Sequence, residues 1–110
     1  MFEAILAKGE ATFGKIAICI TEYLTFAEVV KVWEKVTGKK GQFVEVSTEV
    51  FENIWGPYGS EMAAQYKWSE VYPSWHALFP EKTLSLAELG LEGKLLGHES
   101  GLEDIKERIV

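Results

Sequence analysis

Apolar residues between positions 25 and 38 recur at the spacing of one helix face. Thr25 precedes this stripe and Glu28 follows three residues later, which is the capping-box pattern of a helix start. Gly38 stands where helices commonly end in a left-handed turn. The apolar positions of the stripe are Phe26, Val29, Val30, Trp33 and Val36. The pattern predicts a helix that packs one apolar face against the rest of the protein.

Two segments that flank this helix have the composition of strands. Residues 14–20, GKIAICI, form a nearly unbroken apolar run, which favours a strand covered on both faces. Residues 42–47, QFVEVS, alternate between apolar and polar side chains after Phe43. Strand, helix and strand in this order predict a βαβ unit with parallel strands. Because two strands make a poor sheet by themselves, we expect a partner subunit to complete or cover it.

Further helix signals follow along the chain. The capping-box spacing recurs in residues 85–88 (SLAE) and 100–103 (SGLE), which predicts a helix start at each. Ser47 or Thr48 can cap a helix over residues 50–55. The predicted fold class is α/β, a small α+β-like unit with one βαβ, about two parallel strands and four to five helices.

Aromatic residues gather between positions 55 and 79, which hold three of the four tryptophans and three of the four tyrosines. A helix is predicted from about Ser60 to Val71, because Pro73 disfavours helical geometry at the residue before it. One face of this helix carries Ala64, Trp68 and Val71, and we expect it to lie in the core. Another face carries Met62, Tyr66 and Glu70. Neighbouring loops, a second subunit and a ligand are the candidates to cover that second face.

Length, charge and cysteine content narrow the function classes. With 110 residues the chain is expected to form a single domain over residues 1–110. The net charge of −6 and the scattered basic residues argue against nucleic acid and anionic membranes as partners. Cys19, the single cysteine, lies in an apolar run, where we expect a buried and inert thiol. No signal peptide or membrane-length apolar run is visible, so a cytoplasmic location is expected.

Motifs for metals and nicotinamide cofactors are missing from the sequence. It contains no G-x-G-x-x-G fingerprint and no Y-x-x-x-K, so we expect no bound cofactor. His76 and His98 lie 22 residues apart, without the spacing of a helical metal site, so we expect no metal either. His76 has apolar neighbours in the sequence, and such surroundings shift the titration of a histidine. His76 is therefore either a structural residue or an acid/base group.

Several of these segments together resemble the C-terminal region of fungal NmrA-like proteins, atypical relatives of the short-chain dehydrogenases/reductases. The matching elements are the L-T-x-x-E helix start at 24–28, the V-T-G-K-K helix end at 36–40, the F-V-E-V-S segment at 43–47 and the F-E-x-x-W-G helix at 51–56. The resemblance covers roughly residues 10–110. It implies a substrate-side region without the Rossmann domain that carries the family's glycine loop, and it transfers no catalytic residue.

The resemblance and the aromatic density lead to three functional hypotheses. The first is a free-standing small-molecule-binding protein of fungal secondary metabolism, expected to be a homodimer. If it is an enzyme, a cofactor-independent isomerase, cyclase or dehydratase acting on an apolar metabolite is expected. The others are a non-catalytic interaction or regulatory module, and a remnant of an NAD(P)-dependent reductase.

The candidate site residues follow from these hypotheses. The residues expected to move protons are Glu70, His76 and Tyr66. The residues expected to line an apolar binding site are Trp55, Tyr58, Met62, Trp68, Tyr72 and Trp75.

Overall fold

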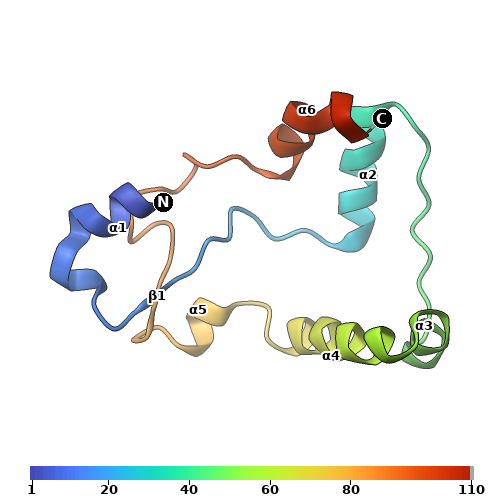
Figure 1. Ribbon diagram of the computed structural model, residues 1–110, viewed down its shortest axis with the longest axis horizontal. Coiled ribbons are helices and arrows are strands. Elements are labelled where there is room, and N and C mark those ends of the chain that lie inside the picture. Colours follow the sequence, from blue (N-terminus) through green and yellow to red (C-terminus); the bar gives the residue numbers. More distant parts are fainter. Residues whose placement is uncertain (110) are drawn as a thin grey trace. The chain divides into compact units, whose positions relative to one another are not determined.

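A computed structural model describes residues 1–109 of the chain. In chain order the elements are α1 (Phe2–Lys8), the 3-10 helix η1 (Gly9–Thr12), β1 (Ile16–Ala17), α2 (Phe26–Thr37), α3 (Thr48–Trp55), α4 (Pro57–Val71), α5 (Trp75–Leu78), β2 (Thr83–Leu84) and α6 (His98–Ile109) (Figure 1). The chain divides into two compact units. Unit 1 comprises Met1–Phe43 and Glu81–Val110, and unit 2 comprises Val44–Pro80. Because each unit is described by itself, the single domain over residues 1–110 stays a prediction.

The helix α2 in unit 1 confirms the capping-box prediction. The Thr25 hydroxyl accepts a hydrogen bond from the Glu28 N–H at 3.2 Å. In return, the Thr25 N–H donates to the Glu28 carboxylate at 2.7 Å. The helix ends at Gly38, whose φ of 71° lies in the left-handed region that favours glycine. Val36, on the predicted apolar stripe, is buried.

The two strands of unit 1 form a parallel pair, which confirms the α/β class but not the predicted second strand. The register pairs Ile16 with Thr83 and Ala17 with Leu84. Residues 42–47 do not form a strand, so that prediction is wrong. Alternation shows only that a segment suits a sheet, whereas a strand also needs a neighbour to hydrogen-bond. Here β2 is the strand that pairs with β1.

The remaining capping-box predictions have different outcomes. Residues 85–88 make the reciprocal bonds, with the Ser85 N–H donating to Glu88 at 2.8 Å, but they open a turn rather than a helix. The last helix, α6, begins at His98 instead of Ser100. Its His98 N–H donates to the carboxylate of Glu22, a residue far away in sequence. A distant side chain therefore takes over the role predicted for Ser100.

Unit 2 is built on the helix pair α3 and α4. The Ser47 hydroxyl accepts from the Val50 N–H at 3.2 Å and caps α3, as predicted. Gly56 separates the two helices, and α4 starts directly at Pro57, three residues earlier than predicted. The ring fixes φ of Pro57 at a helical value, which suits the first position of a helix. The helix ends at Val71, as predicted from Pro73.

Few large side chains are buried within the described residues. The buried apolar residues are Val36, Leu84, Leu86 and Leu89 in unit 1 and Ala63 in unit 2. Ile16 and Cys19 are exposed, which corrects the expectation of a buried thiol. The strand β1 spans only two residues, so the apolar run around Cys19 lacks the cover of a larger sheet. Among residues 1–109, no helix combines the length and hydrophobicity that a bilayer span requires.

Candidate functional site

All the predicted site residues lie in unit 2. Trp55 is the last residue of α3, and α4 carries most of the others. Tyr72 directly follows α4, while Trp75 and His76 open the short helix α5. The residues on α4 are Tyr58, Met62, Tyr66, Trp68 and Glu70. The sequence thus placed the candidates in one compact unit, although it did not establish which of them touch.

The face of α4 that packs against α3 is made of Gly59, Ala63 and Tyr66, at positions i, i+4 and i+7. Gly59 and Ala63 are buried. The ring of Tyr66 meets the ring of Phe51 on α3 edge to face, with centroids 6.0 Å apart and planes at 75°. This is a geometry that aromatic rings favour. Tyr66 is thus a packing residue of the α3–α4 contact.

The opposite face of α4, which we call the outer face, consists of Ala64, Trp68 and Val71. The prediction that this face lies in the core is wrong. Trp68 is 48% exposed and Val71 is 67% exposed. The physical reason is that α3 packs against the small residues Gly59 and Ala63, which turns the outer face half a helical turn away.

The predicted lining residues form two aromatic groups. Trp68 and Tyr72 are in ring contact, with centroids 4.4 Å apart and planes at 42°. Trp55 contacts Phe51, with centroids 6.4 Å apart. Every one of the six predicted lining side chains is exposed, from Tyr72 at 37% to Tyr58 at 80%. Apolar rings at this exposure can take part in binding, but their role as a ligand site stays a prediction.

The three predicted proton-transfer residues occupy different surroundings. Tyr66 is half-buried against Phe51, and Glu70 is exposed one turn further along α4. His76 is half-buried in α5, a separate helix. The side-chain hydroxyl of Ser74 accepts from the Ala77 N–H at 3.2 Å and so fixes the start of that helix. Their catalytic roles remain predictions.

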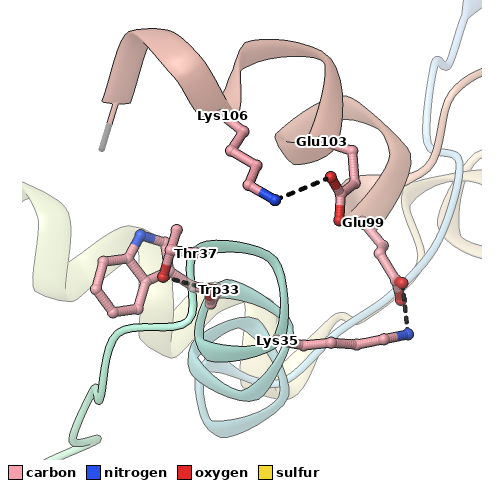
Figure 2. A network of polar contacts seen from close by, with 6 residues as sticks. All are labelled: Trp33, Lys35, Thr37, Glu99, Glu103 and Lys106. Carbon is pink, nitrogen blue, oxygen red and sulfur yellow. Dashed lines mark hydrogen bonds and ion pairs between the residues drawn. The ribbon is translucent and has the colours of Figure 1, made fainter.

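Within residues 1–109, no three His, Cys, Asp or Glu side chains come together as a set of metal ligands. The acidic side chains with defined partners belong to unit 1 and serve structural roles. The Lys35 ammonium on α2 lies 2.5 Å from the Glu99 carboxylate on α6 (Figure 2). On α6 itself, Lys106 and Glu103 are 3.8 Å apart (Figure 2). Only the Lys35–Glu99 pair joins α6 to α2, and each of the two pairs, being exposed, contributes about 0–1 kcal/mol.

The capping carboxylate of α2 has a shifted pKa. The hydrogen bond from the Thr25 N–H, then that from the Thr25 hydroxyl, hold the pKa of Glu28 below its ordinary value. Lys31 acts in the same direction through its charge. This is the expected effect of donors that stabilise the ionised carboxylate.

Sequence reasoning missed two residues that organise unit 2. Phe51 contacts both Trp55 and Tyr66, yet it was not among the candidates. A Cβ placed on Gly59 would lie 2.9 Å from the Cα of Glu52, so only glycine fits there. The signal was present, since small residues at 59 and 63 with Tyr66 at i+7 indicate a close helix approach.

Comparisons with known proteins establish the family. The sequence model of the NmrA-like family matches residues 1–92, which include both strands, unit 2 and α2. No curated protein and no solved structure matches the chain. The match covers most of the 110 residues, and the chain belongs to the NmrA-like family.

Proposed function

We propose that this chain is a non-catalytic binding module, a relative of the NmrA-like reductases whose apolar helix faces are covered by another protein. The observation that carries the proposal is the exposure of large apolar side chains on the outer face of α4. Soluble proteins rarely leave such groups together in water, and apolar patches of this kind often mark interaction sites.

Dye binding and sedimentation test the proposal. Nile red is uncharged and fluoresces in apolar surroundings, so it reports exposed apolar surface without an electrostatic contribution. We expect the isolated chain to sediment as a monomer and to bind Nile red, with less binding in Trp68→Ala. The matched control is Phe13→Ser, which removes a side chain that is 73% exposed in unit 1 and should leave the Trp68 contribution intact. A dimer without Nile red binding would contradict the proposal and favour the homodimer expected from the sequence.

The ring contact between Trp68 and Tyr72 favours a second candidate function, the binding of a small apolar molecule. An aromatic pair that is partly exposed offers both apolar area and a rigid edge to a ligand. Tryptophan fluorescence titrated with polyketide and terpenoid metabolites tests this candidate. A saturable change that disappears in Trp68→Ala is expected, and no change with any metabolite would rule the candidate out. An isomerase, cyclase or dehydratase activity would in addition require Glu70→Gln or His76→Ala to lower turnover about a hundredfold.

A further inference from the structure

We draw no further inference here: the strongest candidate, the exposed outer face of α4 with Trp68 and Val71, carries nothing, because the charges that flank it, Glu61 and Lys67, are of opposite sign and nothing in the structure shows what covers it.

Discussion

Replacing Gly59 by alanine tests whether the contact between α3 and α4 is as close as the structure has it. The added Cβ would lie 2.9 Å from the Cα of Glu52, 3.0 Å from the carbonyl oxygen of Phe51 and 3.0 Å from the Cβ of Trp55. The first two are backbone atoms, which cannot rotate away. The two helices must therefore separate by several tenths of an ångström, and the ring contact between Phe51 and Tyr66 loosens.

The magnitude follows from two opposing effects. Overpacking of this kind costs about 1–3 kcal/mol. Alanine in place of glycine returns at most about 1 kcal/mol through its helix propensity. We therefore expect Gly59→Ala to lower the free energy of unfolding of unit 2 by up to about 2 kcal/mol when the full propensity gain is realised. Gly101→Ala in α6 is the matched control, since a Cβ there meets nothing within 4 Å. This control should stabilise its helix by up to about 1 kcal/mol.

Hydrogen exchange of backbone amides, followed by mass spectrometry, reads the two units separately. Gly59→Ala should speed exchange in residues 48–71 and leave residues 98–109 unchanged. Gly101→Ala should slow exchange in residues 98–109 only. If Gly59→Ala exchanged no faster than the wild type in residues 48–71, the close approach of α3 and α4 would be refuted.

Two further predictions concern unit 1. Glu28 has a lowered pKa, so its stabilisation of α2 is present above the ordinary glutamate pKa of about 4.3 and is lost as the pH falls through the lower folded-state pKa. The unfolding midpoint of the wild type should therefore fall more between pH 7 and pH 3 than that of Glu28→Gln, and equal falls in both would refute the role of the Thr25 hydrogen bonds. Glu22→Ala removes the acceptor of the His98 N–H and should speed amide exchange at the start of α6. Lys35→Met should have a smaller effect, because its ion pair is exposed, and the reverse order would contradict the capping role of Glu22.

The parts of the fold that could be predicted from sequence depend on interactions between residues close along the chain. Three such predictions are confirmed, and each involves only a few neighbouring residues. They are the capping box at Thr25, the cap at Ser47 and the helix end before Pro73. The box at residues 85–88 shows the limit of this reasoning. Its hydrogen bonds form, but they begin a turn, because a cap supplies only the first bonds of a helix and does not ensure its continuation.

The parts that could not be predicted depend on distant residues. The partner of β1 is Thr83–Leu84, a strand of two residues that carries little pattern of its own. The start of α6 is fixed by Glu22, which no local signal connects to His98. Residues 42–47 have the alternation of a strand but are not paired. Pairing is decided by what lies beside a segment, and a single sequence does not give that information.

The candidate site shows the same division. The aromatic residues between positions 55 and 79 are close together in the sequence, and these residues all lie in unit 2. The sequence pattern assigned the faces of α4 incorrectly, because size and hydrophobicity favoured Trp68 over Gly59 as a core residue. Helices approach most closely where side chains are small, so Gly59 and Ala63 mark the packed face. The bulky outer face is left exposed.

The central claim is that the outer face of α4 is open to solvent in the isolated chain. Hydroxyl-radical footprinting with mass spectrometry tests it directly, since tryptophan oxidises in proportion to its exposure. Trp68, 48% exposed, should oxidise faster than the half-buried Trp33 of α2. Oxidation of Trp68 no faster than that of Trp33 in the isolated chain would contradict the claim.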